Sequence, residues 1–378
     1  MDFTLPDAVT ELTSLTADIA TTIGTDEHLA ALAAADAPLD DALWRALAAA
    51  GLLALELPVD LVGDAGAGLS IVESAAVAEQ LGRSLARVPF GAHAMAATPV
   101  LARHGTPTLR QTWLARAATG VAVLAVAVEE HRTHICGLSA PHTALARTGD
   151  GWSLAGSKVN VAYAGAADAL VVTATGPDGP CVIVVPADAT GVTITDTPVT
   201  GTTPTAVVDF DDVAIDAAAI LDGGATAVTE LVHRYTLAVC ADQRGTLSRA
   251  LELTSAYAAE REQFGRAIGS FQAVAQRLAD GYIDVQALSL TTTQALWRFT
   301  QACSGEPDDL TTAVATAKFW ACEAGHRVAH TTIHVHGGVG LDTSHPVHRF
   351  FLRAKQNEFT LGAAPIALAT IGEAVATR

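Results

Sequence analysis

The chain has 378 residues, enough for two or three structural units, and half of them are hydrophobic although only 5% are aromatic. Its formal net charge of −18 argues against a broad surface for nucleic acid or for anionic membranes. An anionic ligand must therefore be met by a local cluster of arginine, histidine or backbone amides. We expect the partner to be a small molecule or another protein chain.

The five cysteines are widely spaced and form no Cys-x-x-Cys pair, which is typical of a reduced cytosolic protein. The N-terminal residues lack the basic and apolar regions of a secretory signal. The longest apolar run that we identify, from Gly120 to Val128, is too short to span a bilayer. We therefore predict a soluble, cytoplasmic protein.

Residues 1–118 show helical periodicity, for example in Leu43, Leu47 and Leu52 and again over 71–85, and predict an N-terminal helical domain. Residues 119–222 predict a β domain. Its apolar or β-branched runs at 121–128, 181–186 and 206–215 are candidate strands, and a hairpin turn is expected at 149–151.

Residues 223–378 return to helical periodicity and predict a C-terminal bundle. An apolar stripe runs from Phe271 through Tyr282 to Phe299 at spacings of three, four or seven, and we expect it to form the core of the bundle.

Two C-terminal motifs are specific. Ala259 to Asp284 reads AEREQFGRAIGSFQAVAQRLADGYID, and His334 to Lys355 reads HVHGGVGLDTSHPVHRFFLRAK. With FDDVAI and ILDGG at the end of the predicted β domain, they resemble the acyl-CoA dehydrogenase family over nearly the whole chain. The resemblance implies the α+β acyl-CoA dehydrogenase fold, with an N-terminal helical domain, a middle β domain and a C-terminal four-helix bundle.

The residues of these motifs suit a dinucleotide. Arg261 offers a planar cationic fork for a pyrophosphate, and adjacent glycines let the backbone approach phosphate oxygens. In the resembled family these positions reach across a dimer interface to an FAD held mainly by the neighbouring subunit. His334 stands where the family has glutamine. The candidate FAD contacts are Arg261, Phe264, Phe271, Gln272, His334, Gly337 and Gly338. The alternative is that Arg261 and Phe264 only cap and pack a helix junction.

Other family features are missing. The stretch 126–146 lacks the Pro and the Gly-Ser-Asp of the family's Thr-Glu-Pro-x-x-Gly-Ser-Asp segment, although Glu129 matches its Glu. Residues 158–165, KVNVAYAG, replace the Trp-Ile-Thr stretch that faces the flavin ring. Counting along the motifs places the two family positions of the catalytic base on Tyr235 and Gly362, and neither is a carboxylate. Glu358 and Glu230 lie within a turn or two as fallback bases.

The chain therefore resembles the short, non-catalytic subunit of the heteromeric acyl-CoA dehydrogenases of actinobacteria, which oxidise CoA-activated sterol side chains. This resemblance implies FAD, a second acyl-CoA dehydrogenase-like subunit in an α₂β₂ assembly, a bulky acyl-CoA substrate and an electron-transfer flavoprotein or similar acceptor. No catalytic residue is assigned to this chain, and no nucleic acid or membrane is expected as a partner. The alternatives are a self-sufficient homotetramer with an unrecognised base, a purely structural partner subunit and a flavin monooxygenase of the same fold.

Glu323, His326, His330 and His334 follow one another at helical spacing, which is compatible with a metal site. A di-iron site needs a second Glu-x-x-His, and a zincin motif needs a glutamate where Arg327 stands. We interpret these histidines as surface and interface residues and predict no metal.

Overall fold

The computed structural model describes residues 7–35, 37–131, 140–149, 151–303, 309–343 and 345–376. Its N-terminal part is helical, and polar caps mark two of the helix starts. The Asp40 carboxylate accepts a hydrogen bond from Leu43 N at 3.1 Å, and Ser70 and Glu73 form a capping box. The helices are α1 (Asp7–Ile23), α2 (Asp26–Ala34), α3 (Asp41–Ala49), α4 (Val59–Val62), α5 (Ile71–Arg83), α6 (Thr98–His104), α7 (Pro107–Leu109) and α8 (Ala115–Ala118).

A seven-stranded sheet follows, with the order β1-β4-β2-β3-β7-β6 and with β5 paired to β4. Thr148 lies opposite Gly151 in the antiparallel pair of β2 and β3, so the predicted hairpin is confirmed. The strands predicted from apolar runs are confirmed as well. The strands are β1 (Leu124–Ala127), β2 (Ala144–Thr148), β3 (Gly151–Ala162), β4 (Ala169–Gly176), β5 (Gly179–Pro186), β6 (Val192–Thr197) and β7 (Thr205–Ile215).

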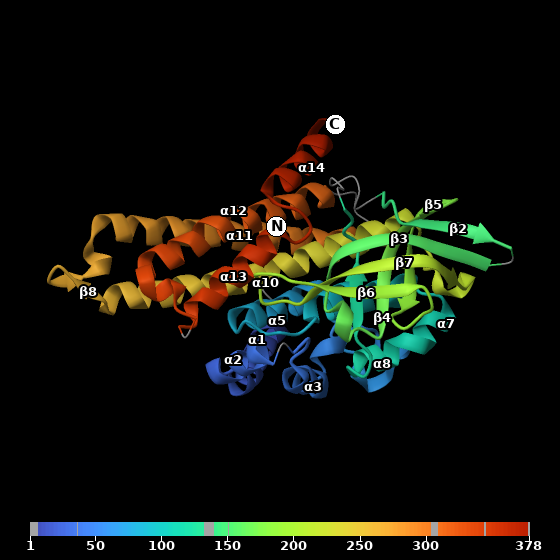
Figure 1. Ribbon diagram of the computed structural model, residues 1–378, viewed down its shortest axis with the longest axis horizontal. Coiled ribbons are helices and arrows are strands. Elements are labelled where there is room, and N and C mark those ends of the chain that lie inside the picture. Colours follow the sequence, from blue (N-terminus) through green and yellow to red (C-terminus); the bar gives the residue numbers. More distant parts are fainter. Residues whose placement is uncertain are drawn as a thin grey trace.

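Long helices complete the chain. With 36 residues, α10 is about 54 Å long and runs from the β domain to the far end of the molecule (Figure 1). It packs against α11, α12 and α13, and the predicted α+β fold with its three parts in this order is confirmed. The elements are α10 (Ala225–Glu260), β8 (Glu262–Gln263), β9 (Arg266–Ala267), α11 (Gln272–Cys303), α12 (Leu310–His336), α13 (Val347–Phe359) and α14 (Ala364–Ala376).

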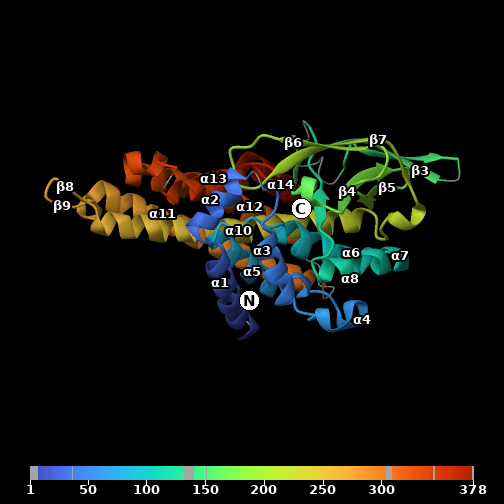
Figure 2. The same cartoon turned by 60° about the horizontal axis from the view of Figure 1, so that its bottom comes forward.

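The N-terminal helix α5 and the C-terminal helix α13 both pack on α10, and Figure 2 shows them on different sides of it. The β domain covers the end of α10 where the helix begins (Figure 1). This arrangement leaves a cavity where the three parts of the chain meet.

The predicted core stripe of α11 is only half correct. Val285, Thr292, Leu296 and Phe299 are buried, but Tyr282 is 59% exposed. The reason is that the first half of α11 projects with the end of α10 beyond the N-terminal helices (Figures 1 and 2). Periodicity shows which side of a helix is apolar, but not whether this chain or another one covers that side.

The stretch Val347–Ala376 has the length and composition of a membrane-crossing helix, which the search for apolar runs in the sequence missed. The structure divides this stretch into α13 and α14 at a turn where Leu361 and Gly362 have positive φ angles of 59° and 94°. A single candidate of this kind is weak support for a membrane span.

Candidate functional site

The end of α10 leads into a short, exposed hairpin. Arg261 caps the helix, and its carbonyl accepts a hydrogen bond from Ile268 N at 2.8 Å. The turn between β8 and β9 contains Phe264 and Gly265, which both have positive φ angles, of 54° and 80°. A left-handed conformation costs a residue other than glycine about 1–2 kcal/mol. Phe264 nevertheless adopts it, and its side chain is 92% exposed.

Aromatic and cationic groups meet beside this turn. The rings of Phe264 and Phe271 lie edge to face with their centroids 6.1 Å apart. The guanidinium of Arg266 lies over the Phe271 ring, 4.1 Å from its centroid. The result is an exposed surface of π faces and positive charge, a combination that binds bases and phosphates.

The glycine motif lies at the end of α12. Gly337 has a φ of 60°, and a Cβ atom on Gly337 or Gly338 would meet no atom within 4 Å. His336 stacks on Tyr257 of α10 with ring centroids 4.4 Å apart, so the C-terminal ends of α10 and α12 lie side by side. His334 and Gln272 are exposed at the same end of the bundle. The structure thus gathers the predicted cofactor contacts at the outer end of the bundle, which we call the outer surface.

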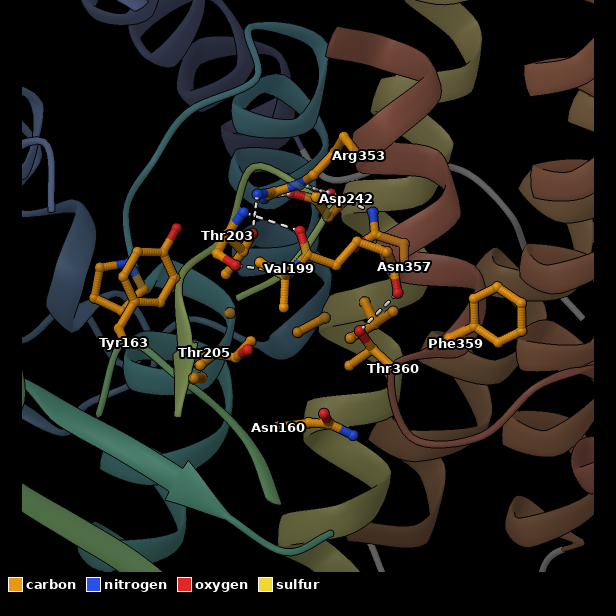
Figure 3. A pocket seen from close by; sticks show the side chains of 18 of the residues that line it. Asn160, Tyr163, Val199, Thr203, Thr205, Asp242, Arg353, Asn357, Phe359 and Thr360 are labelled. Atoms are coloured by element: carbon orange, nitrogen blue, oxygen red, sulfur yellow. Dashed lines mark hydrogen bonds and ion pairs between the residues drawn. The ribbon is translucent and has the colours of Figure 1, made fainter. Parts of the chain in front are cut away.

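A separate cavity of about 710 Å³ lies between α5, α10, α13, the end of β3 and the segment 198–205 (Figure 3). None of the residues of the outer surface lines it. Arg353 on α13 donates hydrogen bonds to Asp242 on α10 at 2.9 and 2.6 Å, and Asn357 donates another to Asp242 at 2.6 Å. Arg353 also bonds Thr203, so the network ties the segment to both helices.

Both predicted base positions lie near this cavity, and neither can act as a base. Tyr235 is buried and lines the cavity, and burial raises the pKa of its hydroxyl. Gly362 lies in the turn after α13 with a φ of 94°. A Cβ atom there would come within 2.6 Å of the Ile366 side chain.

The two fallback bases, Glu230 and Glu358, form ion pairs outside the cavity. Glu230 accepts hydrogen bonds from Arg234 at 2.9 Å and from His104 at 2.8 Å. Burial alone would raise the pKa of Glu230, but His104 and Arg234 outweigh it and lower this pKa to about 2. Glu358 pairs with Lys355 at 2.6 Å and faces His326 on α12. Neither carboxylate is among the residues that line the cavity.

Glu129, two residues after the first strand, lies near both base positions. Its carboxylate accepts a hydrogen bond from Leu361 N at 3.2 Å, next to Gly362. Burial raises the pKa of Glu129 to about 6, and its charge in turn raises that of Tyr235. The sequence matched Glu129 to a motif but could not show this position, because 232 residues separate it from Leu361. Residues 132–139, where much of the expected flavin-ring segment would fall, lie outside the described residues.

The histidines of α12 form no metal centre in the part of the chain that the structure describes. His326 faces Glu358 at 3.3 Å and Lys355 at 3.1 Å, and its ring packs on that of His330. The cation Lys355 competes with any metal ion for this position.

Comparisons with known proteins agree with this architecture. The acyl-CoA dehydrogenase C-terminal domain matches residues 222–376, and the N-terminal domain of the same family matches residues 17–121. The acyl-CoA dehydrogenase FadE27 of Mycobacterium tuberculosis is 43% identical over 100% of this chain and 99% of its own length. FadE28 of the same organism is 31% identical over 88% of this chain and 92% of its own length.

Two solved structures are similar over almost the full length. A chain of the ChsE4-ChsE5 complex from Mycobacterium tuberculosis superposes with a TM-score of 0.93 at 43% identity and covers 100% of both chains. A chain of the G363A variant of the Tcur3481-Tcur3483 steroid acyl-CoA dehydrogenase gives a TM-score of 0.89 at 36% identity, with 98% of each chain covered.

Proposed function

This chain belongs to the acyl-CoA dehydrogenase family, and from that premise we propose that it is the non-catalytic subunit of a heteromeric, FAD-dependent acyl-CoA dehydrogenase. Its outer surface binds the ADP half of an FAD, and a partner subunit binds the flavin ring of the same FAD. The partner supplies the catalytic base, and the substrate is an acyl-CoA with a bulky, steroid-like acyl group. An electron-transfer flavoprotein or a similar protein accepts the electrons from the complex.

The observation that carries the proposal is the exposed Phe264. Phe264 is 92% exposed in a strained turn beside Arg261, Arg266 and Phe271, so the part of the chain that the structure describes leaves most of its ring uncovered. Exposed strain of this kind is typical of functional positions. The residues fit the group: Arg261 can bind a pyrophosphate, Phe264 and Phe271 can cover an adenine, and the open space at Gly337 admits close approach.

Exposed apolar side chains on α11 support the presence of a partner chain that covers this helix. Tyr282, Ile283 and Leu290 are each about 60% exposed along the helix that begins at the outer surface. Contiguous exposed apolar side chains mark interaction surfaces. A partner that covers this helix brings its flavin next to Arg261. Two heteromeric structures among the relatives, ChsE4-ChsE5 and Tcur3481-Tcur3483, favour a second acyl-CoA dehydrogenase subunit in this place.

When bound, FAD would supply the acceptor for the hydride that leaves the β-carbon of the acyl group. This chain contributes position and charge. Arg261 neutralises pyrophosphate charge, and the aromatic pair shields the adenine from water. Its own base positions give no proton acceptor, because the Tyr235 hydroxyl stays protonated and Gly362 has no side chain.

The test is to express the chain with and without a co-encoded acyl-CoA dehydrogenase subunit, and to measure flavin absorbance and mass. We expect a colourless chain alone and a yellow mixed tetramer together. Arg261→Ala should weaken FAD binding by the complex about tenfold or more, since hydrogen bonds to charged groups contribute about 1.5–3 kcal/mol. Arg45→Ala, at an exposed position on α3, is the matched control. A flavin content that Arg261→Ala leaves unchanged would favour a purely structural subunit.

A self-sufficient homotetramer is the second candidate, and Glu129 favours it. This carboxylate has a pKa of about 6 and lies beside both base positions. A yellow homotetramer that loses turnover in Glu129→Gln, with flavin retained, would establish this candidate and refute the heteromeric one.

A further inference from the structure

A smaller cavity of about 250 Å³ lies between α2, the segment that follows α5, the segment 198–205 and the first turns of α13. Neither Tyr235 nor Gly362 lines it, and it shares only Gly201 and Leu352 with the cavity beside the base positions. The residues of the outer surface do not line it either. The smaller cavity is therefore separate from both of these sites.

The polar lining of the smaller cavity is cationic. Arg87 comes from the segment after α5, and His348 and Arg349 come from the first turn of α13. Among the described residues, no carboxylate lines the smaller cavity. Such a lining is unexpected in a chain in which aspartate and glutamate outnumber lysine and arginine by 40 to 22. Two guanidinium groups around one enclosed space favour an anion.

Arg87 has a buried donor that is not used within the chain. Its Nη1 donates to Leu32 O at 3.4 Å, which holds the side chain against α2. Its Nε is buried and has no hydrogen-bond partner, and no carboxylate of the described residues pairs with the guanidinium. Buried charged donors are normally satisfied, because an unmade hydrogen bond of this kind is costly. An acceptor inside the smaller cavity would satisfy this donor.

Thr202 brings a second unused group to the same space. Its Oγ1 is buried and has no partner among the described residues. A hydroxyl can donate to an anion that also accepts from a guanidinium. Arg87 and Thr202 thus offer one anion two different donors from two separate parts of the chain.

Arg349 is held only by an exposed carboxylate. Its side chain is 15% exposed and its Nη1 lies 3.2 Å from Asp26, whose side chain is 67% exposed. Ion pairs with such an exposed partner are weak, so Arg349 can bind an anion in the smaller cavity instead. In addition, α13 begins without a side-chain cap, and the start of a helix attracts negative charge.

We propose that the smaller cavity binds a phosphoryl group, either as inorganic phosphate or as the end of a phosphate monoester, through Arg87, Thr202 and Arg349. A phosphoryl group carries the negative charge and the several acceptor oxygens that these donors require. The bound group connects the N-terminal helices, the segment 198–205 and α13. This site takes neither the flavin nor the acyl group of the substrate, so it goes beyond the proposed function and does not depend on it.

Radiolabelled inorganic phosphate is the probe. Equilibrium dialysis uses the full-length chain with any subunit that co-purifies, and a saturating excess of FAD keeps the outer surface occupied. We expect saturable binding with a dissociation constant of about 1 mM or lower, and one phosphate for each copy of this chain. Arg87→Gln should weaken binding at least about tenfold, because hydrogen bonds to charged groups are the strong ones. Arg45→Gln, at an exposed arginine of α3 outside the smaller cavity, is the matched control and should bind like the wild type.

Thr202→Val gives a second measurement that removes no charge. It should weaken phosphate binding about three- to tenfold, the loss expected for one hydrogen bond. The melting temperature without phosphate should not fall, because the hydroxyl has no partner to lose among the described residues. Thr205→Val is the matched control, since Thr205 Oγ1 is also unpaired but lines the other cavity, and it should leave phosphate binding unchanged.

Asp26→Asn should change the affinity in the opposite direction. It removes the carboxylate that competes for Arg349, so phosphate should bind about two- to fivefold more tightly. A variant that only damaged the fold would not gain affinity, so this gain separates a specific site from general loss of structure.

Competition by unlabelled methyl phosphate distinguishes the two sources of the phosphoryl group. Displacement shows a site that accepts phosphate monoesters, no displacement shows a site for free phosphate, and both results support the proposal. No saturable binding, equal binding by the wild type and Arg87→Gln, or displacement by potassium chloride at the same ionic strength would overturn the proposal and leave the proposed function intact. Displacement by FAD would also overturn it, because the phosphate would then occupy the outer surface.

Discussion

Arg353 of α13 and Asp242 of α10 form a buried ion pair with two hydrogen bonds, of 2.9 and 2.6 Å, across one wall of the cavity. Asp242→Ala leaves the Arg353 guanidinium without its counter-charge and should lower the free energy of unfolding by about 3–5 kcal/mol. Urea denaturation measures this change. Glu252→Ala, which breaks the exposed pair with Arg83, should change it by about 1 kcal/mol or less. Equal effects of the two variants would show that the buried pair has no special part in stability.

Lys158 and Glu130 form a second buried pair, inside the β domain. Lys158 Nζ donates to Glu130 Oε1 at 2.6 Å and to Thr173 Oγ1 at 3.0 Å. Burial would raise the Glu130 pKa, but the hydrogen bonds from Lys158 and Thr143 and the charge of Lys158 together outweigh it and lower this pKa to about 2. The stability that ionised Glu130 contributes is therefore present above pH 4.5 and is lost as the pH falls towards 2. Glu130→Gln should be destabilised near pH 7, and chemical denaturation should show the difference narrowing below pH 4.

The raised pKa of Glu129 predicts that its contribution to stability changes with pH in the opposite direction. Its pKa is raised to about 6, so its protonated form is favoured in the folded chain, and the associated stability is lost as the pH rises through 6. Glu129→Gln keeps an acceptor for Leu361 N and should be more stable than the wild type by about 1–2 kcal/mol above pH 7. Below pH 4.5 the two proteins should unfold alike, which serves as the internal control. A constant difference at all pH values would contradict the raised pKa.

The ion-paired carboxylates should be dispensable for turnover. Glu230→Gln and Glu358→Gln remove charges that face Arg234 and Lys355, not the cavity. In the co-purified complex, we expect each variant to retain turnover per bound flavin, measured by dye reduction with an acyl-CoA. Loss of turnover in Glu358→Gln with full flavin content would identify Glu358 as the base.

Phe264 should show a conflict between stability and flavin binding. Asparagine tolerates the left-handed conformation better than phenylalanine, so Phe264→Asn should stabilise the isolated chain by up to about 1 kcal/mol. The same variant should lower the flavin content of the complex, because the aromatic face is lost. Thermal unfolding and flavin absorbance test the two effects. Unchanged flavin content would mean that Phe264 does not contact the cofactor.

Local patterns in the sequence predicted much of the fold. The strands rich in valine and isoleucine and the hairpin between β2 and β3 depend on neighbouring residues, so the sequence could reveal them. Tyr282 was placed wrongly in the core, because the same apolar stripe can face this chain or another one.

The candidate site could be predicted only in part. The contacts of the outer surface come from two compact motifs, whereas the surroundings of the base positions combine residues from three parts of the chain. Asn357 and Phe359 line the cavity whereas Glu358, between them, does not, and no sequence pattern predicts which of these positions faces it. The cavity itself depends on how the segment 198–205 lies over α13, which is a tertiary property.

The turn after α13 restricts which amino acids position 362 can accept. At position 362 the backbone has a φ of 94°, and a Cβ atom would collide with Ile366. A single replacement of Gly362 by glutamate therefore cannot return a proton acceptor to this place without rebuilding the turn and its neighbour. The conformation of this turn therefore closes one single-step route by which a carboxylate could be introduced at this position.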